Sequence, residues 1–391
     1  MQTLIVGAGI AGPTLAYWLA RSRHEVTLVE RAPELRRGGY MVDFWGAGFD
    51  VAERMGIVAE LRRRGYALKE ARVVDNAGHR IASLRPAEIL GDTARYVSIA
   101  RSDLAAVIYD ALDGGAELIL DDAVRTLTDE GDRVRVTFEK GEPRVFDLVV
   151  GADGLHSRVR RLAFGPDGQF ERNLGIVVAA FEVKGYRPRE ELIGMMHAEV
   201  GFQVVRVPLR DDVTLFLLSV RHDGPAPVED RAAAEALLRR ALAGGGWETP
   251  AILDVMPRAE TFYFDTVSQI RMPSWSRGRV ALVGDAAACP SFLAGQGSAL
   301  AMVESYTLAA ELSRCGDHVE AFARYERRLA PLLRSKQDAA TNLGLAFAPK
   351  NRFQLVTRNS VMKLMGLPKV ADMVMGRSFR DKVELPPVAA A

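Results

Sequence analysis

The first thirty residues alternate between short apolar runs and one amphipathic stretch. Residues 3–6 and 26–29 are rich in apolar and β-branched side chains, which predicts two buried strands. Between them, residues 15–21 place apolar side chains at helical spacing, and Pro13 and Thr14 mark the start of that helix. The pattern predicts a strand–helix–strand unit whose first turn is the glycine-rich segment 7–12.

The rest of the chain changes pattern twice. Residues 71–82 alternate around a turn at 76–78 and predict a hairpin, and a series of antiparallel strands is expected at 176–183, 201–208 and 213–220. Further buried strands are expected at 134–138, 145–150 and 279–283. Helical spacing occurs at 49–64, at 103–112 after Ser102 as a cap, and at 231–243, 297–312 and 319–345. This order predicts an α/β protein in which a mostly antiparallel sheet interrupts a parallel one.

The first turn carries the spacing G-x-G-x-x-G. Gly7 permits the tight turn, Gly9 lets the backbone approach a pyrophosphate, and Gly12 lets the helix pack closely on the strand. Glu30 closes the second strand, 18 positions after Gly12, where a carboxylate accepts hydrogen bonds from ribose hydroxyls and repels a 2′-phosphate. The segment therefore predicts a site for FAD or NAD and disfavours NADP at this position.

Two further motifs each follow a predicted strand. Residues 147–161 read DLVVGADGLHSRVRR, with a sharp turn at Asp153 and Gly154. Residues 278–305 contain a Gly-Asp pair at the end of a strand, and then Gly295, Gln296 and Gly297 at the start of a helix rich in small residues. Glycines at a helix start leave backbone N–H groups free to face a ligand.

Composition narrows the class of protein. The 391 residues are 48% hydrophobic and 26% charged, which is typical of a globular protein long enough for two domains. A net charge of +1 gives no general attraction for nucleic acid or acidic membranes, and no stretch of 18 apolar residues predicts a membrane span. Two cysteines, Cys289 and Cys315, make no disulfide framework, and the N-terminus is unlike a signal peptide. We expect a cytoplasmic enzyme without a metal site.

The three motifs, in this order and at this spacing, carry a specific resemblance. G-x-G-x-x-G, then GADG, then GDAA…GQG resembles the class A FAD-dependent aromatic hydroxylases with the para-hydroxybenzoate hydroxylase fold, over about residues 1–345. Residues 38–48, GGYMVDFWGAG, and 100–104, ARSDL, are also similar to the branch of the tetracycline-inactivating monooxygenases. The resemblance implies a Rossmann-like FAD-binding domain with a second Gly-Asp motif, interleaved with a substrate domain on a mostly antiparallel sheet.

The domain boundaries follow from this resemblance and from the pattern above. We expect the FAD-binding domain at 1–70, 96–172 and 276–345, and the substrate-binding domain at 71–95 and 173–275. A C-terminal helical segment is expected at 346–391, with a final amphipathic helix and a frayed, proline-rich end.

The resemblance also implies cofactor roles for particular residues. The glycine turn and Glu30 would hold the ADP half of FAD, Arg101 would contact its backbone, and Asp153 lies in a motif linked to both FAD and NAD(P)H. Asp285 would bond a ribityl hydroxyl, the segment 295–297 would place N–H groups at the flavin pyrimidine ring, and Asp43 matches an acid on the flavin loop of the tetracycline branch. The complete set of expected cofactor-binding residues is Gly7, Gly9, Ile10, Ala11, Gly12, Glu30, Arg31, Arg37, Asp43, Arg101, Asp153, Asp285, Gly295, Gln296, Gly297 and Ser298.

The implied reaction is an oxygenation by the cofactor. NADPH or NADH reduces FAD, O₂ then forms the flavin C4a-hydroperoxide, and this hydroxylates an aromatic or polycyclic, largely apolar small molecule. No protein side chain is expected to act as a classical catalytic residue, and the chain is expected to be a monomer or a weak homodimer. The side chains expected in the substrate cavity are Phe202, Phe216, His197, Pro290 and Phe292.

Some alternatives remain open from the sequence. An FAD-dependent reductase or halogenase of the same fold, or a non-catalytic flavin-binding protein, would carry the same motifs. A disulfide reductase is disfavoured because the two cysteines are 26 positions apart. The loop after the Gly-Asp pair departs from the family at Ala288, Ser291 and Phe292, with Pro290 one position early, so the surface facing the substrate is altered.

Overall fold

A six-stranded sheet organises one half of the protein. The computed structural model describes residues 1–35, 40–85, 95–366 and 383–388, the side chains of 342–346 excepted. Five neighbouring strands run parallel, and the sixth, β17, pairs antiparallel at the edge. In sheet order the strands are β17 (Ser276–Arg277), β18 (Val280–Leu282), β11 (Leu148–Gly151), β1 (Gln2–Val6), β2 (Glu25–Val29) and β7 (Glu117–Ile119).

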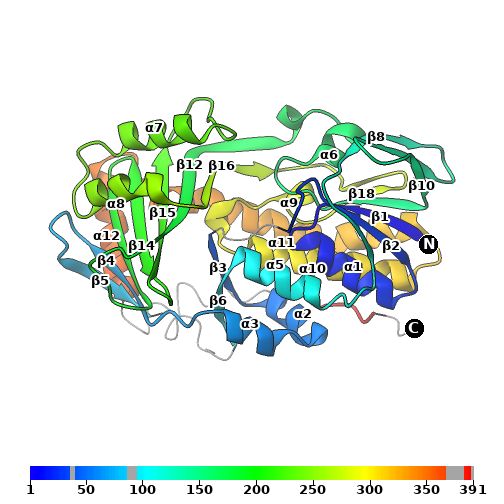
Figure 1. Ribbon diagram of the computed structural model, residues 1–391, viewed down its shortest axis with the longest axis horizontal. Helices are drawn as coiled ribbons and strands as arrows, with labels where there is room; N and C mark the ends of the chain where they lie inside the picture. The colour runs from blue at the N-terminus through cyan, green and yellow to red at the C-terminus, as the bar shows by residue number, and fades with distance from the viewer. Residues whose placement is uncertain (36–39, 86–94, 367–382, 389–391) are drawn as a thin grey trace.

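Helices pack around this sheet and bury its apolar faces (Figure 1). They are α1 (Ala11–Arg21), α5 (Arg101–Asp110), α6 (Arg158–Ala163), α10 (Gly297–Arg314) and the long α11 (His318–Phe347). The single helix expected at 49–64 is wrong: the chain forms α2 (Ala47–Met55) and α3 (Val58–Arg64), because Gly56 turns at a φ of 73°. Helix α5 begins at Arg101 after Ala100, so Ser102 is not its cap.

Two small sheets flank the six-stranded sheet. Strands β10 (Arg144–Phe146), β9 (Val134–Phe138) and β8 (Val124–Asp129) form one, and β3 (Met41–Phe44) and β6 (Val97–Ala100) form the other. The one strand expected at 145–150 is therefore wrong. The chain leaves the small sheet at Phe146, and β11 then enters the six-stranded sheet, so one apolar run serves two sheets.

A seven-stranded sheet organises the other half. Its order is β16 (Phe262–Ile270), β12 (Glu171–Lys184), β15 (Val213–Arg221), β14 (Phe202–Pro208), β13 (Ile193–Glu199), β4 (Glu70–Val74) and β5 (Arg80–Leu84). All neighbours pair antiparallel except β13 and β4. The predicted hairpin is β4–β5, whereas β13 and β16 were not among the predicted strands. Helices α7 (Arg231–Ala241) and α8 (Thr249–Val255) pack on one face.

The C-terminal part runs along both halves. After α11, helix α12 (Arg352–Met365) packs on β5 at the far end of the seven-stranded sheet (Figure 1). Residues 383–388 then lie against the first half, where Leu385 is buried and the Pro386 carbonyl accepts a hydrogen bond from Tyr306 at 2.6 Å. The expected fraying is thus wrong for these residues. The exact domain boundaries stay a prediction, and no helix in the described parts of the chain is long and apolar enough to cross a membrane.

Candidate functional site

The glycine-rich turn has the close packing that its spacing predicts. Gly7 has a φ of 105°, and a Cβ atom there would lie 2.6 Å from the Ala152 carbonyl oxygen. A Cβ atom on Gly12 would overlap the Gly7 carbonyl oxygen and press on Leu28. The first turn of α1 therefore lies directly on the ends of β1 and β11, and only glycine permits this.

Gly9 differs from these two because space is open above it. Among the described residues, a Cβ atom on Gly9 would meet within 4 Å only the Arg101 Nη2 atom, at 3.5 Å. Beside this opening the Glu30 carboxylate, at the end of β2, accepts the backbone N–H groups of Ala8 at 2.8 Å and Ala32 at 3.0 Å. A cation, a helix N-terminus and a carboxylate thus border one cradle, while Arg31 is exposed beside it.

Asp153 fixes the start of α6. Its carboxylate accepts the N–H groups of Arg158 at 2.7 Å and Val159 at 3.0 Å, and the Ser157 hydroxyl. Burial raises the pKa of Asp153, and these hydrogen bonds oppose the rise. The side chain therefore acts as a helix cap, and its backbone packs against Gly7.

Arg160, in the same motif, is a buried side chain that connects α6 to the Gly-Asp loop. The sequence pattern did not predict this contact. Its side chain is fully buried, and it donates to the Ala286 carbonyl at 3.1 Å, the Leu155 carbonyl at 2.6 Å and the Asp167 carboxylate at 2.7 Å. A run of arginines usually predicts a solvated helix face. Only the tertiary contact with Ala286, in the Gly-Asp loop, reveals this one as structural.

The Gly-Asp loop brings the third motif to the same place. Gly284 has a φ of 63° and precedes the short α9 (Asp285–Ala288). Burial raises the pKa of Asp285, and the nearby Arg101 guanidinium opposes this rise. A Cβ atom on Gly297, at the start of α10, would lie 3.8 Å from the Asp285 Oδ1 atom. Asp285 therefore lies between the Arg101 guanidinium and the first turn of α10.

Polar atoms without partners lie at the start of α10. Gln296 is 4% exposed, and its Nε2 atom has no hydrogen-bond partner among the described residues. The same holds for the Ser291 hydroxyl, 3% exposed, in the loop before it. Buried polar groups are normally hydrogen-bonded, so these atoms await a ligand or water. Together with the open cradle at Gly9, they show that the residues present fit a dinucleotide that reaches from α1 to α10.

Buried side chains of α10 hold these parts together. The Glu304 carboxylate accepts the Gly284 N–H at 2.8 Å and the Tyr325 hydroxyl at 3.3 Å. The Ser305 hydroxyl donates to the Ala11 carbonyl at 2.9 Å, which ties α10 to α1. Burial raises the pKa of Glu304 to about 8. Glu304 was not predicted, because nothing in an apolar helix pattern shows what an embedded acid contacts.

An apolar layer borders the polar site on the side of the seven-stranded sheet. The Tyr40 ring lies 5.0 Å from the Tyr263 ring and 5.2 Å from the Phe292 ring, centroid to centroid. Phe292 and Tyr263 pack on a cluster that includes Val178 of β12 and Leu293. Pro290 is buried beside it, and its carbonyl accepts a hydrogen bond from Gln269 at 3.1 Å. Phe292 thus lies where a ring-facing residue is expected.

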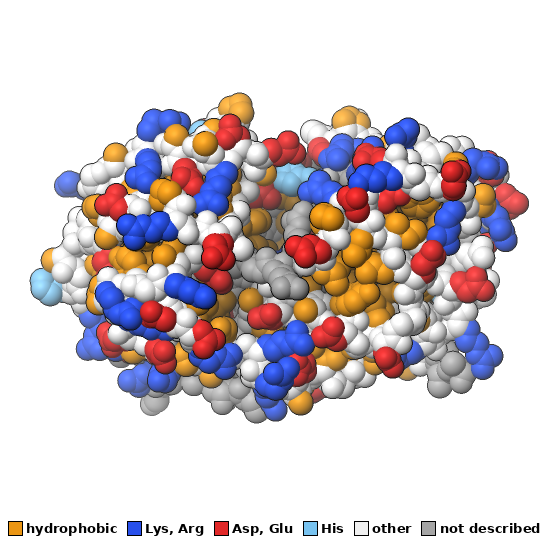
Figure 2. All heavy atoms as spheres, viewed as in Figure 1, with side chains coloured by type: hydrophobic (Ala, Val, Ile, Leu, Met, Phe, Trp, Pro, Cys, Tyr) orange, Lys and Arg blue, Asp and Glu red, His pale blue; other side chains and the backbone are white. Residues whose placement is uncertain are grey.

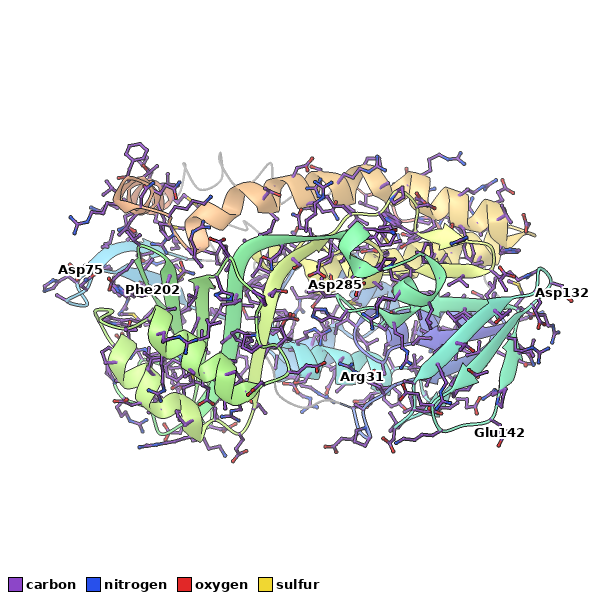
Figure 3. The ribbon with its side chains drawn as sticks, turned by 90° about the horizontal axis from the view of Figure 1, so that it is seen from above. Arg31, Asp75, Asp132, Glu142, Phe202 and Asp285 are labelled. Atoms are coloured by element: carbon purple, nitrogen blue, oxygen red, sulfur yellow. The ribbon has the colours of Figure 1, made fainter. Side chains whose placement is uncertain are left out.

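Three of the expected cavity residues are wrong. Phe202 and Phe216 are buried in the core between the seven-stranded sheet and α7 and α8. His197 is fully buried against Phe202 and Trp247 and contacts the Val74 carbonyl and Glu199. On β12, alternate residues face this core and the Phe292 layer, so these side chains lie on the opposite face of the sheet. Figure 3 shows Phe202 well apart from Asp285.

Two other expected residues lie at the edge of the site. The Asp43 carboxylate, exposed on β3, accepts hydrogen bonds from the Tyr96 hydroxyl at 2.7 Å and from Ser98. Arg37 lies outside the described residues. No contact in the structure tests a cofactor role for either one.

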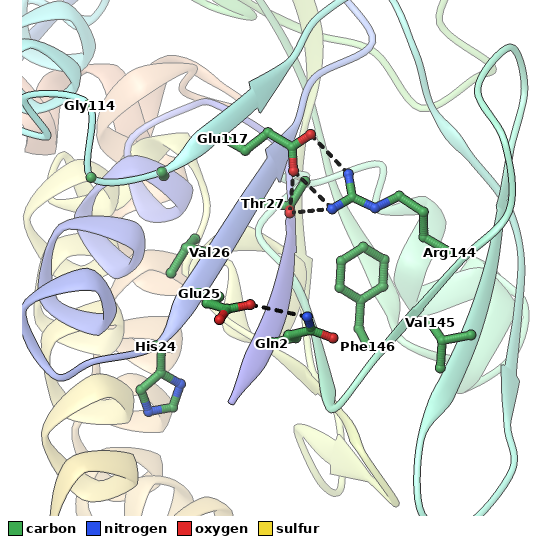
Figure 4. A pocket seen from close by; sticks show the side chains of 12 residues that line it. Gln2, His24, Glu25, Val26, Thr27, Gly114, Glu117, Arg144, Val145 and Phe146 are labelled. Atoms are coloured by element: carbon green, nitrogen blue, oxygen red, sulfur yellow. Dashed lines mark hydrogen bonds and ion pairs between the residues drawn. The ribbon is translucent and has the colours of Figure 1, made fainter.

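Two surface cavities lie away from this site. One of about 570 Å³ borders β2, β7 and β10, and Arg144 crosses it to pair with Glu117 at 2.9 Å (Figure 4). The other, about 520 Å³, lies between His156 and residues 226–230. This second cavity lies at the boundary between the two halves of the molecule. Figure 2 shows that the surface is hollowed between them.

Comparison with known proteins identifies the family. A family model described as FAD binding domain matches residues 1–327. The chain belongs to this family. A flavin-dependent monooxygenase of an unknown prokaryotic organism is 35% identical over 376 residues, covering 95% of this chain and 96% of that protein. An uncharacterised protein of Mycobacterium tuberculosis strain H37Rv is 38% identical over 374 residues, covering 93% and 100%.

The solved structures agree with this family. The crystal structure of tetracycline destructase Tet(55) matches the monooxygenase with a TM-score of 0.84 at 32% identity, covering 98% of each chain. The predicted superfamily, its nearness to the tetracycline-inactivating branch and the α/β fold are thereby confirmed. The protein is an FAD-dependent monooxygenase, and the convergent motifs described above form its candidate cofactor site.

Proposed function

We propose that this monooxygenase uses NADPH or NADH and O₂ to hydroxylate an aromatic or polycyclic, largely apolar small molecule. The observation that carries the proposal is the meeting of the three motifs. Arg101 lies against Gly9 and beside Asp285, and the backbone of Asp153 packs against Gly7. The apolar layer of Tyr40, Tyr263 and Phe292 borders that meeting point.

The residues from α1 to α10 would hold FAD. The N-terminus of α1, with Gly7, Gly9, Ile10, Ala11 and Gly12, would hold the pyrophosphate, because its free N–H groups and helix dipole favour negative charge. Glu30 would accept the hydroxyls of the adenosine ribose, and Arg31 would border them. Asp285 would accept a ribityl hydroxyl, and its closeness to Arg101 favours the charged carboxylate needed for this.

The flavin end of the proposed site lies at α10. When bound, FAD supplies the redox chemistry, accepting electrons from the nicotinamide and passing them to O₂. The N–H groups of the segment Gly295, Gln296, Gly297 and Ser298 would stabilise the negative charge of the reduced ring. The Gln296 Nε2 atom, buried without a partner among the described residues, would be a further donor for that charge. Asp153 would support the site through α6, and Asp43 from β3. A cofactor contact by Arg37 is also proposed.

The chain's part in the oxygenation is to exclude water and to orient the substrate. Tyr40, Tyr263 and Phe292 form an apolar wall against which a flat ring packs. The relatedness to Tet(55), named a tetracycline destructase, favours a polycyclic substrate. A cytoplasmic location and a monomeric or weakly dimeric state stay predictions.

The test is reduction and turnover of the purified protein with FAD. We expect NADPH or NADH to bleach the bound flavin, and an added tetracycline, phenol or polyketide to stimulate oxygen uptake and to gain one oxygen atom in its mass. Gln296→Leu, which removes the donor and keeps a side chain of similar size, should slow flavin reduction without loss of folding. A flavin that neither nucleotide reduces, with no substrate stimulating oxygen uptake, would overturn the proposal in favour of a non-catalytic flavoprotein.

A further inference from the structure

Helix α12 presents an apolar face to solvent. Phe353 is 79% exposed, Val356 64%, Leu364 54% and Val361 44%. Half of the large hydrophobic side chains that are exposed in the described parts of the chain lie on this one helix. At 100° per residue, the four positions fall within one arc of the helix. Scattered exposed apolar residues are ordinary, whereas a stripe along one helix indicates a binding surface.

The opposite face fixes α12 in this orientation. Arg358 is buried, and its Nη2 atom donates to the Gln203 Oε1 atom at 2.6 Å. The Asn351 side chain caps the helix by accepting the Gln354 N–H at 2.9 Å. The helix also packs on β5. The exposed stripe is therefore held outward by contacts on the inner face, at one end of the molecule (Figure 3).

The charged residues of the chain segment that carries the stripe have one sign. No Asp or Glu occurs between positions 338 and 372, a segment that contains α12. Lys350, Arg352 and Lys363 are exposed at the two ends of the helix. Val200 is 44% exposed, and the N–H group of its neighbour Gly201 donates a hydrogen bond to the Pro349 carbonyl. Val200 therefore extends the apolar surface past the start of the helix. The whole chain has a net charge of only +1, so this excess is local.

We propose that α12 docks this protein onto a lipid surface that carries anionic headgroups. The helix would lie in the plane of the interface, with Phe353, Val356 and Leu364 at the acyl boundary and Arg352 and Lys363 against phosphate groups. Charge complementarity selects the partner, because a helix with basic ends and no acid of its own matches an anionic surface. A helix docked in this way lies on the lipid surface and does not cross it. No helix among the described residues is long and apolar enough to cross a membrane.

Docking there has a consequence for substrate entry. The turn before α12 follows Ala348, which is fully buried in the same apolar cluster as Leu293 and Val178. That cluster supports the layer of Phe292 and Tyr263 beside the candidate flavin site. The docked helix would thus bring this apolar layer close to the lipid, the phase in which an apolar polycyclic compound concentrates. The docking itself does not depend on the proposed reaction.

Sedimentation of the full chain, loaded with FAD, with lipid vesicles tests the inference. We expect binding to vesicles that contain phosphatidylglycerol, weaker binding to phosphatidylcholine alone, and a decrease with added salt. Phe353→Ser with Val356→Ser should lower the binding constant at least about tenfold, since burial of each side chain is worth more than tenfold when complete. Arg352→Gln with Lys363→Gln should lower it about thirtyfold on anionic vesicles only, since each basic residue near the surface contributes about fivefold.

The control is Val319→Ser, because Val319 is 59% exposed on α11 and lies outside the stripe. It should leave binding unchanged. Circular dichroism and the melting temperature verify that every variant folds, and flavin content shows the cofactor site intact. No sedimentation with either vesicle would overturn the proposal. So would a concentration-dependent dimer in light scattering that Phe353→Ser abolishes, since a second copy would then cover the stripe.

Discussion

At the scale of single residues, the two kinds of glycine in the first turn have different tasks. Gly7 and Gly12 have no room for a side chain, because backbone atoms occupy the place of a Cβ atom. Gly9 has room, and what it keeps clear is the cradle beside Arg101. The motif spacing predicts all three glycines, but only the structure distinguishes those needed for folding from the one that leaves space for a ligand.

This distinction gives a prediction for two matched substitutions. Gly12→Ala should lower stability by about 2 kcal/mol or more, because α1 must move off β1. Gly9→Ala should leave the melting temperature of the FAD-free protein nearly unchanged and weaken FAD binding about five- to thirtyfold, by loss of a close backbone contact worth about 1–2 kcal/mol. Melting curves without cofactor and a flavin fluorescence titration measure the two effects. Equal losses of stability in both variants would contradict this assignment.

At the scale of elements, Glu304 is the joint between α10, α11 and the Gly-Asp loop. It accepts hydrogen bonds from Gly284 and Tyr325, and Tyr325 also contacts the Leu282 carbonyl. Burial without a paired cation disfavours the charged carboxylate, which is why its pKa rises to about 8. The candidate site thus depends on a carboxyl group that is largely protonated at neutral pH.

Stability should therefore depend on pH through Glu304. The unfolded chain ionises this residue near its ordinary pKa of 4.5, and the folded protein only near 8. The folded state binds the extra proton between these values, so the free energy of unfolding falls as pH rises through the window, by about 3–5 kcal/mol in total. Glu304→Gln keeps an acceptor for Gly284 but does not titrate.

The measurement is the melting temperature of both proteins, without FAD, across this window. As pH rises, the melting temperature of the Gln variant should increase relative to that of the wild type. This difference should level off above about pH 8. Parallel curves for the two proteins would show that Glu304 is not the titrating group.

At the scale of the whole molecule, a His–Asp pair joins the two halves. The His156 Nε2 atom, on the loop before α6, lies 3.1 Å from the Asp265 Oδ1 atom on β16. The hydrogen bond to Asp265 raises the pKa of His156 above 6.5. A cavity of about 520 Å³ opens beside His156, so this pair lies at the boundary between the two halves.

A raised pKa in a histidine stabilises the fold at low pH. The contribution of the pair is complete below pH 6.5 and is lost as pH rises through the raised pKa of the folded state. His156→Gln should therefore lower the melting temperature near about pH 6, by the equivalent of about 1 kcal/mol or less because the ring is 47% exposed. The difference should vanish near about pH 9. His79→Gln, 83% exposed on the β4–β5 hairpin, is the matched control and should show no such dependence.

Sequence and tertiary structure determine different features of this protein. The glycine spacing, the acid after β2 and the Gly-Asp and GQG segments predicted the fold class and the place of the candidate cofactor site, because backbone conformation and close packing restrict residue choice locally. The strands predicted at 201–208 and 213–220 gave no information on which face of the sheet meets the site, so Phe202 and Phe216 were assigned to the wrong face. The burial of Arg160 and Glu304 and the outward face of α12 depend on elements far apart in sequence. Which partner covers a side chain is decided by packing, and a pattern along one element carries no information about it.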